Sequence, residues 1–263
     1  MSRETEEKLA AALTAETTEL IPFLPYLLQD FWELGSDPAL MVALLEKHAH
    51  LPKTARILDL ACGKGAVAVK VAERLGVQVK GVDLLPGFVE YAAGKAREHG
   101  VSDLCVFTVG DVNEAAKTER DYDCVIFGAA GNVLGDPVET LDKLKAAIKP
   151  GGYILIDECY LPDDGERADI RYNNYEYLTE SQWAALFQAA DLTVIEAAVP
   201  DTTATTDSDT GMAAITARAQ ELIAKYPSKR ELFEGYIRSQ QNEYDDLDSR
   251  LVGVTWMLRK RSD

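Results

Sequence analysis

The chain has 263 residues, 47% of them hydrophobic, which is enough for one large domain or one domain with an appended cap. Its formal charge is −17, from 27 basic and 44 acidic side chains, and such a surface repels the phosphates of nucleic acids and anionic membranes. No run of about 18 apolar residues predicts a membrane span, and residues 1–20 lack the apolar core of a secretory signal. We therefore expect a soluble cytoplasmic protein, a monomer or homodimer, whose partners include no nucleic acid and no membrane.

The first fifty residues are predicted to be helical. Three segments carry apolar residues at helical spacing, namely 5–20, 22–34 and 37–50. The second segment is rich in aromatic residues, which are Phe23, Tyr26, Phe31 and Trp32. We expect residues 1–50 to form an N-terminal helical segment that covers the functional site.

From residue 55 onwards, short β-rich runs alternate with helical segments. The predicted strands are 55–60, 77–84, 103–111, 122–128, 153–160, 191–199 and 250–261. Helix-like segments follow the first, second and fourth of these strands, and the second of them ends at Gly100. Strands that alternate with single helices predict a parallel sheet covered on both faces.

After residue 160 this alternation is lost. Residues 161–178 are polar and aromatic without a clear period, and a helix is predicted at 179–190. Two further helical segments, 211–226 and 228–245, lie between the last two strands, which are therefore about fifty residues apart. We assign 51–199 to a ligand-binding core, 200–249 to a helical cap insertion and 250–263 to the last core strand.

The loop after the first strand reads Asp59-Leu-Ala-Cys-Gly63-Lys-Gly65. Glycine is needed where a backbone turns sharply or approaches a ligand, and ligands of open parallel sheets bind outside the carboxyl ends of the strands. Asp83 ends the second strand, where an acid can accept the hydroxyl hydrogens of a ribose. The loop lacks the G-x-G-x-x-G and G-x-x-x-x-G-K-[ST] patterns, and the acid before it suits an ammonium group better than a pyrophosphate.

Each acid at a strand end also has a purely structural interpretation. Asp59 could cap the helix that follows it, and Asp83 could cap the next helix, where Pro86 suits the first turn. Asp111, after the third strand, could belong to an ordinary turn. The occurrence of all three acids at successive strand ends favours a ligand site.

The cysteines and histidines predict no metal site. The four cysteines lack C-x-x-C spacing, and the histidines lie on helix-like polar stretches. A thiol-based metalloid site that uses Cys62 and Cys159 is the alternative.

Five segments in order carry a resemblance to a known family: DLACGKG, GVDLLPGFVEYA, VGDVNEA, YDCVIFGAAGNVLGD and IKPGGYILIDE. They resemble the class I S-adenosylmethionine-dependent methyltransferases, in the small-molecule methyltransferase-domain branch, over residues 55 to about 160. The resemblance implies an α/β fold with a Rossmann-like, seven-stranded, mostly parallel sheet and helices on both faces. It also implies that the last strand is antiparallel and that a helical cap is inserted before it.

The resemblance further implies which residues bind S-adenosyl-L-methionine: Asp59, Ala61, Gly63, Gly65, Asp83, Leu84, Asp111, Val112, Phe127 and Gly128. The first four would hold the methionine part, Asp83 the ribose hydroxyls, and Leu84 with Asp111 and Val112 the adenine. Phe127, Gly128 and Ala129 would line the methionine and sulfonium region. Ala61 stands where the family often has glycine, which alanine tolerates if the backbone angle is ordinary.

The implied function is transfer of a methyl group to a small-molecule acceptor by in-line displacement. The cofactor brings the activated methyl group, so the protein mainly aligns the nucleophile and excludes water, and a base is needed only for a protonated acceptor. The catalytic residues stay open, with candidates for acceptor contact at Asn132, Asp157, Glu158, Tyr160, Tyr172, Asn173 and Tyr175. Two other interpretations also stay open, a cofactor-binding Rossmann-like protein without transferase activity and a nicotinamide-dependent oxidoreductase.

Overall fold

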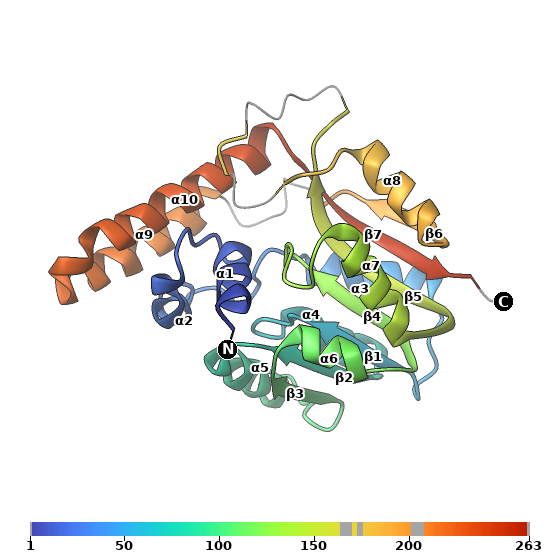
Figure 1. Cartoon of the computed structure of the whole chain (residues 1–263). Coiled ribbons are helices and arrows are strands. Elements are labelled where there is room, and N and C mark those ends of the chain that lie inside the picture. Colours follow the sequence, from blue (N-terminus) through green and yellow to red (C-terminus); the bar gives the residue numbers. More distant parts are fainter. Residues whose placement is uncertain (1, 164–169, 173–175, 201–207, 262–263) are drawn as a thin grey trace. The chain divides into compact units, whose positions relative to one another are not determined.

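A computed structural model of the chain describes residues 2–163, 170–172, 176–200 and 208–261 (Figure 1). The chain divides into two compact units. The helical unit comprises Met1–Phe31, Cys159–Glu180 and Asp201–Gly253, and the sheet unit comprises Trp32–Glu158, Ser181–Pro200 and Val254–Asp263. Within the described ranges, every helix is too short or too polar to cross a bilayer.

In the described part of the chain, seven strands form one sheet in the order β3-β2-β1-β4-β5-β7-β6. The strands are β1 (Arg56–Leu60), β2 (Gln78–Asp83), β3 (Cys105–Val109), β4 (Tyr122–Gly128), β5 (Ile148–Tyr160), β6 (Leu192–Ala198) and β7 (Val252–Lys260). β1 pairs in parallel with β2 and β4, as do β2 with β3 and β4 with β5, whereas β6 and β7 are antiparallel. The predicted Rossmann-like fold, with its antiparallel last strand, is confirmed.

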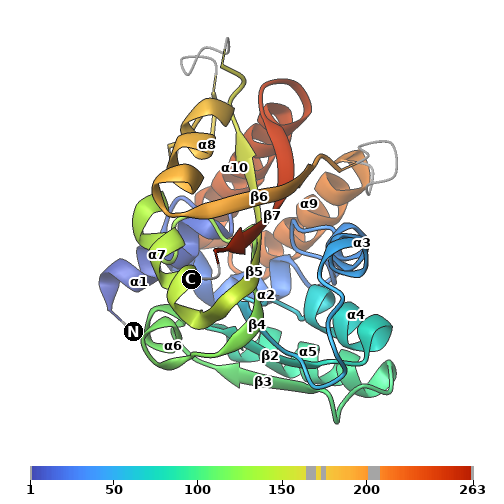
Figure 2. The same ribbon diagram turned by 90° about the vertical axis from the view of Figure 1, so that its right-hand side faces the viewer.

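Helices cover both faces of the sheet (Figure 2). One face carries α3 (Pro38–His48), α4 (Ala66–Leu75) and α5 (Pro86–Glu98), and the other carries α6 (Val112–Thr118), α7 (Pro137–Ala147) and α8 (Glu180–Ala189). The central strand β4 is buried without interruption from Cys124 to Phe127. A continuous apolar run is typical of a parallel strand with helices on both faces, because neither side of it meets water.

The helical unit has a core of its own. It contains α1 (Arg3–Ala12), the 3₁₀ helices η1 (Thr18–Phe23) and η3 (Pro227–Lys229), α2 (Leu24–Leu27), α9 (Ser208–Lys225) and α10 (Arg230–Ser249). The long helices α9 and α10 run side by side (Figure 1). Leu24, Leu27, Ile215 and Phe233 are fully or almost fully buried together in this unit, so its helices are stabilised by their own apolar contacts.

The N-terminal fifty residues differ from the prediction in two ways. The helix expected over 22–34 is wrong, because the chain forms only η1 and the four-residue α2 there, and residues 28–37 contain neither helix nor strand. In addition, residues 1–50 are divided between the two units. α3 belongs to the sheet unit because Met41 and Leu45 are buried in the core that α3 shares with α4 and the sheet.

Candidate functional site

The loop between β1 and α4 contains residues with a left-handed backbone, among them its two glycines. The φ angles are 52° at Gly63 and 75° at Gly65, and Gly65 is the N-cap residue of α4. A Cβ atom added to Gly65 would lie 2.7 Å from the Cβ atom of Ala92, so only glycine suits both the angle and the space. This geometry places the N-terminal turn of α4, whose first N–H groups have no partner within the helix, directly after the end of β1.

Ala61 has the same left-handed conformation, with a φ angle of 60°. The condition under which alanine would be tolerated here, an ordinary backbone angle, is therefore not met. A non-glycine residue in this region is strained by roughly 1–2 kcal/mol because its Cβ atom crowds the following carbonyl oxygen. The loop keeps this strained shape with alanine in place of glycine, which indicates that the neighbouring structure fixes it.

Asp59 ends β1 beside this loop and is buried, with 3% of its surface exposed. Its carboxylate accepts a hydrogen bond from the Ala68 N–H in α4, whereas Oδ2 accepts none from the residues that the structure describes. Burial, followed by the nearby charge of Asp83, raises the pKa of Asp59 to about 8. One oxygen of Asp59 thus bonds to the first turn of α4, as the capping interpretation predicted, whereas Oδ2 is left without a hydrogen-bond partner among the described residues.

Asp83 ends β2 and is hydrogen-bonded to the glycine loop. Its Oδ2 atom accepts from the Gly63 N–H and its Oδ1 atom from the Leu85 N–H, both at 2.9 Å. Burial raises the pKa of Asp83, and these two hydrogen bonds oppose the increase. Because each carboxylate oxygen has two lone pairs, Asp83 retains the capacity to accept further hydrogen bonds.

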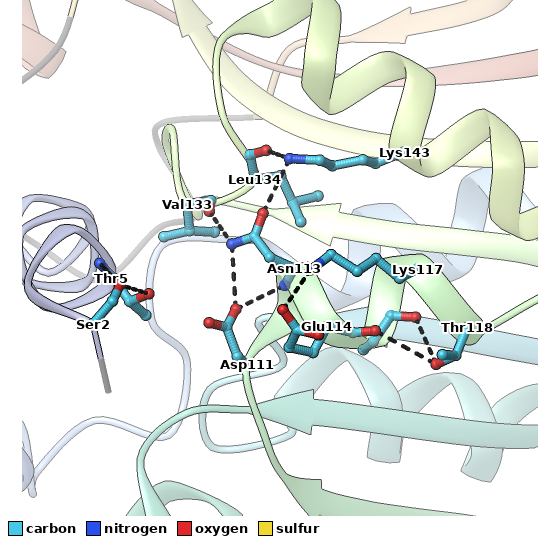
Figure 3. A network of polar contacts seen from close by, with 11 residues as sticks. Ser2, Thr5, Asp111, Asn113, Glu114, Lys117, Thr118, Val133, Leu134 and Lys143 are labelled. Carbon is cyan, nitrogen blue, oxygen red and sulfur yellow. Dashed lines mark hydrogen bonds and ion pairs between the residues drawn. The ribbon is translucent and has the colours of Figure 1, made fainter.

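Asp111 lies at the start of α6, in the polar network of Figure 3. Its Oδ1 atom accepts from the Asn113 N–H at 2.8 Å, so Asp111 caps α6, whereas the structural interpretation placed it in an ordinary turn. The side chain of Asn113 also donates to the carbonyl oxygen of Val133 at 2.8 Å, and Lys143 donates to both Asn113 and the carbonyl oxygen of Leu134. The network joins the end of β3 to the loop after β4.

The remaining predicted ligand residues differ in how far they are buried. Phe127, the penultimate residue of β4, is fully buried. Val112 is also buried, whereas Leu84 and Gly128 are half-buried. Cys62, in the glycine loop, is half-buried, and burial raises the pKa of its thiol, which disfavours the reactive thiolate.

The candidates for acceptor contact are divided between the two units. Asn132 is exposed in the loop after β4, and Asp157 and Glu158 lie at the end of β5 in the sheet unit. Tyr160 and Tyr172 belong to the helical unit. Asn173 and Tyr175 lie outside the described residues. Groups of His, Cys, Asp or Glu suited to a metal ion are absent from the described ranges.

Residues 32–37, here called the strap, lie against the site and were predicted to be partly helical. The Trp32 Nε1–H donates to the carbonyl oxygen of Lys64 at 3.1 Å. A Cβ atom added to Gly63 would lie 3.2 Å from Leu34, and one added to Gly128 would lie 2.3 Å from Ser36 Oγ. The strap therefore contacts both the glycine loop and the end of β4.

The sequence does mark the end of the strap, at the start of α3. Asp37 caps α3, accepting from the N–H groups of Ala39 and Leu40, and Pro38 takes the first helical position. An N-cap acid followed by proline marks a helix start, and a new helix starting at 38 requires a break before it.

Comparison with known proteins identifies related sequences and folds. Residues 51–227 match the model of a family described as "Methyltransferase domain". Over 101 residues the chain is 32% identical to an aklanonic acid methyltransferase of a Streptomyces species, and over 106 residues it is 34% identical to the tRNA 5-carboxymethoxyuridine methyltransferase of Escherichia coli K12. These matches cover 38% and 40% of this chain but only 46% and 40% of the relatives, less than half their length.

A solved structure has a similar fold over most of the chain. It is a SAM-dependent methyltransferase from Thiobacillus denitrificans in complex with S-adenosyl-L-homocysteine, with a TM-score of 0.71 and 22% sequence identity. The similarity covers 91% of this chain and 98% of that one. At this identity the comparison supports the fold.

Proposed function

The chain belongs to the methyltransferase-domain family, as its resemblance to class I S-adenosylmethionine-dependent methyltransferases predicted, and from that premise we propose that it transfers a methyl group from S-adenosylmethionine to a small-molecule acceptor. The observation that carries the proposal is the carboxylate of Asp59, buried beside the glycine loop with Oδ2 unpaired among the described residues. A buried carboxylate at such a position suits an ammonium group, which supplies both charge and hydrogen bonds.

The three strand-end acids and the glycine loop would hold the cofactor. Asp59 would bind the ammonium group of its methionine part, next to the backbone of Ala61, Gly63 and Gly65. Asp83 would accept hydrogen bonds from the ribose hydroxyls through its remaining lone pairs, while its present bonds fix its orientation.

The adenine would lie beyond the ribose, towards β3. Leu84 would pack against the ring, and Asp111 with Val112 would meet its amino edge. The hydrogen bonds of Asp111 within the network of Figure 3 hold that carboxylate in place. Phe127, being fully buried, would support Gly128 from below.

The cofactor supplies an activated methyl group on a sulfonium sulfur. The task left to the chain is to hold the acceptor in line with the bond that breaks and to exclude water, which can lower the barrier by up to about 7–11 kcal/mol. We place the acceptor at the carboxyl ends of β4 and β5, next to Gly128. Asn132, Asp157 and Glu158 are the polar candidates that the sheet unit offers there.

The charge of the chain supports a small acceptor rather than a nucleic acid. One relative acts on a tRNA and another on aklanonic acid, according to their names, so the family alone does not decide between the two classes. The net charge of −17 opposes the phosphate contacts on which tRNA affinity depends. We further propose that residues 200–249 select the acceptor, because β6 and β7 are antiparallel and this connection leaves and returns at one edge of the sheet.

Isothermal titration calorimetry with S-adenosylmethionine and S-adenosylhomocysteine tests the cofactor assignment. We expect both to bind, and Asp59→Asn to weaken the binding of each by at least tenfold. Asp142→Asn is the matched control, because it makes the same replacement at an exposed position on α7 of the sheet unit. A folded wild-type chain that binds neither compound contradicts the proposal.

The acceptor class is tested with methyl-labelled S-adenosylmethionine. The label is offered with the low-molecular-mass filtrate of a cell extract or with total tRNA from the same cells. Label in a small product supports the proposal, whereas label in tRNA alone contradicts the small-molecule part of it. Binding of the cofactor without label in either fraction indicates a cofactor-binding protein that transfers nothing.

A further inference from the structure

Ser36 and Asp157 form a pair outside the set of residues to which we assign the cofactor. Asp157 lies near the end of β5, in register with Gly128 at the end of β4, and its carbonyl oxygen accepts from the Ala129 N–H at 3.0 Å. The hydroxyl of Ser36, on the strap, is hydrogen-bonded to the carboxylate of Asp157. Asp157 as a whole residue is half-buried.

We propose that Asp157 is the general base of the transfer and that Ser36 positions it. This inference rests on the proposed function and deepens it, because it names the group that takes the proton from the acceptor. The acceptor class is then a small molecule whose nucleophilic nitrogen or oxygen carries a hydrogen when it binds.

The first support is position. Two strap residues two positions apart contact the glycine loop and the acceptor side, because Leu34 lies against Gly63 and Ser36 lies against Gly128. In the sheet, β4 separates β1 from β5, so with strand spacings of about 4.8 Å the ends of β1 and β5 are about 10 Å apart. Asp157 is therefore too far along the sheet edge to repeat the role of Asp59, yet close enough to serve a molecule bound beside Gly128.

The second support is electrostatic. The pKa of Asp157 is raised to about 7 because burial, and to a smaller extent the charge of Asp37, outweigh the hydrogen bond from Ser36, which lowers it. Asp37 is the N-cap residue of α3, and its charge is the second cause, after burial, that raises the pKa of Glu33. A carboxylate whose pKa lies near neutrality takes up a proton more readily than an ordinary aspartate and is still largely ionised at slightly alkaline pH.

The proposed transfer is a displacement at the methyl carbon that releases one proton. A lone pair of the acceptor nitrogen or oxygen forms the new bond to the methyl carbon, and the electron pair of the breaking carbon–sulfur bond stays on sulfur. The hydrogen of the acceptor leaves as a proton and binds the Asp157 carboxylate, from which it passes to solvent. The products are the methylated acceptor and the neutral thioether, and no oxidant or further reactant is required.

The acceptor is first identified in the filtrate from the mass of its labelled product. Methyl transfer to this acceptor is then measured with three variants of the full chain. Asp157→Asn should lower kcat by about 100-fold or more, the usual contribution of a general base, and Asp157→Glu should restore part of that loss. Ser36→Ala should move the acidic limb of the pH–rate profile to higher pH, because it removes a hydrogen bond that favours the ionised carboxylate. Asp142→Asn is the charge control and should change neither quantity.

Two results overturn the proposal: Asp157→Asn with kcat close to that of the wild type, or Ser36→Ala with an unmoved acidic limb. The affinity for S-adenosylhomocysteine is measured in parallel and should stay within about threefold, a change of about 0.6 kcal/mol. Failure of the wild type to bind S-adenosylhomocysteine would instead count against the proposed function.

A further measurement requires no acceptor. If Asp157 titrates near neutrality in the folded chain, the wild type loses stability relative to Asp157→Asn as the pH rises from about 4 to about 7, because the folded state holds the proton longer than the unfolded state. A difference in unfolding temperature that stays constant over this range overturns the proposal.

Discussion

The carboxylate of Asp59 is held at 3% exposure with Oδ2 unpaired among the described residues, and this surrounding disfavours its ionised form. Its pKa is raised from 3.8 to about 8, so between these values the folded state binds a proton that the unfolded state has released. The contribution of Asp59 to stability therefore decreases as the pH rises from about 4 to about 8. The ionised carboxylate of Asp59, which suits a cationic ligand, therefore destabilises the ligand-free chain at alkaline pH.

We predict that Asp59→Asn stabilises the ligand-free chain at pH 8 by about 1–3 kcal/mol, because the amide removes a buried charge. The gain should shrink towards pH 5, where the wild-type carboxyl is protonated. Thermal unfolding of both proteins across this pH range measures the effect, with Asp142→Asn as the control. A gain that does not depend on pH would show that Asp59 ionises normally.

The left-handed backbone of Ala61 gives a second prediction. Ala61→Gly should raise the free energy of unfolding by up to about 1 kcal/mol, because glycine adopts a φ angle of 60° without strain. Ala146→Gly, at an exposed position in α7, should instead lower it by about 1 kcal/mol. Urea unfolding of the two variants compares them, and a loss of stability in Ala61→Gly would contradict the prediction.

The end of β4 gives a third prediction. A Cβ atom at Gly128 would lie 2.3 Å from Ser36 Oγ and 3.0 Å from Met41 Cε, so Gly128→Ala should displace the strap and destabilise the chain by about 1–3 kcal/mol. Gly94→Ala is the matched control. A Cβ atom added to Gly94, in α5, would lie 3.7 Å from its nearest neighbour, Nη2 of Arg97, which is an ordinary contact. We therefore expect Gly94→Ala to stabilise the chain by about 0.5–1 kcal/mol. Equal effects of the two substitutions in urea unfolding would show that the contact with Ser36 is unimportant.

At the scale of elements, the strap shows where prediction from sequence reaches its limit. The strands were predictable because runs such as Cys124 to Phe127 are apolar without interruption, and the strand-end acids follow directly from the strand boundaries. The structure of residues 28–37 was not predictable from the sequence. Phe31, Trp32 and Leu34 have a spacing compatible with a helix, but Trp32 and Leu34 instead contact Lys64 and Gly63, which lie far away in the sequence. The pairing of Ser36 with Asp157 joins residues 121 positions apart, and no local pattern encodes it.

The attachment of the strap is testable at Trp32. The indole ring lies 5.0 Å from the ring of His99, and the ammonium groups of Lys70 and Lys95 lie 5.4 Å and 5.2 Å from its centre. Trp32→Phe keeps an aromatic ring but removes the hydrogen bond to Lys64, so it should weaken the attachment by about 0.5–1.5 kcal/mol. Faster amide hydrogen exchange confined to residues 33–37 is the expected result. Trp183→Phe, in α8, is the tryptophan control and should leave the exchange of the strap unchanged.

At the scale of the whole molecule, the chain separates a sheet unit that carries every predicted cofactor residue from a helical unit with its own core. Phe233 is fully buried in the helical unit and meets the ring of Phe23 edge to face at 5.1 Å. Phe233→Ala should destabilise this unit by about 3–5 kcal/mol, the usual cost of removing a buried phenylalanine ring. If residues 200–249 select the acceptor and not the cofactor, the two ligands should respond differently to this change.

We therefore expect Phe233→Ala to keep its affinity for S-adenosylhomocysteine within about tenfold, or 1.4 kcal/mol, while transfer to the acceptor is largely lost. Calorimetric unfolding should show a lowered transition that Phe187→Ala, with the same ring removed from the sheet unit, does not reproduce. Titration calorimetry and the methyl-transfer assay are carried out at a temperature above that lowered transition. Undiminished transfer there would contradict the assignment of acceptor selection to the helical unit, because transfer would then proceed with that unit unfolded.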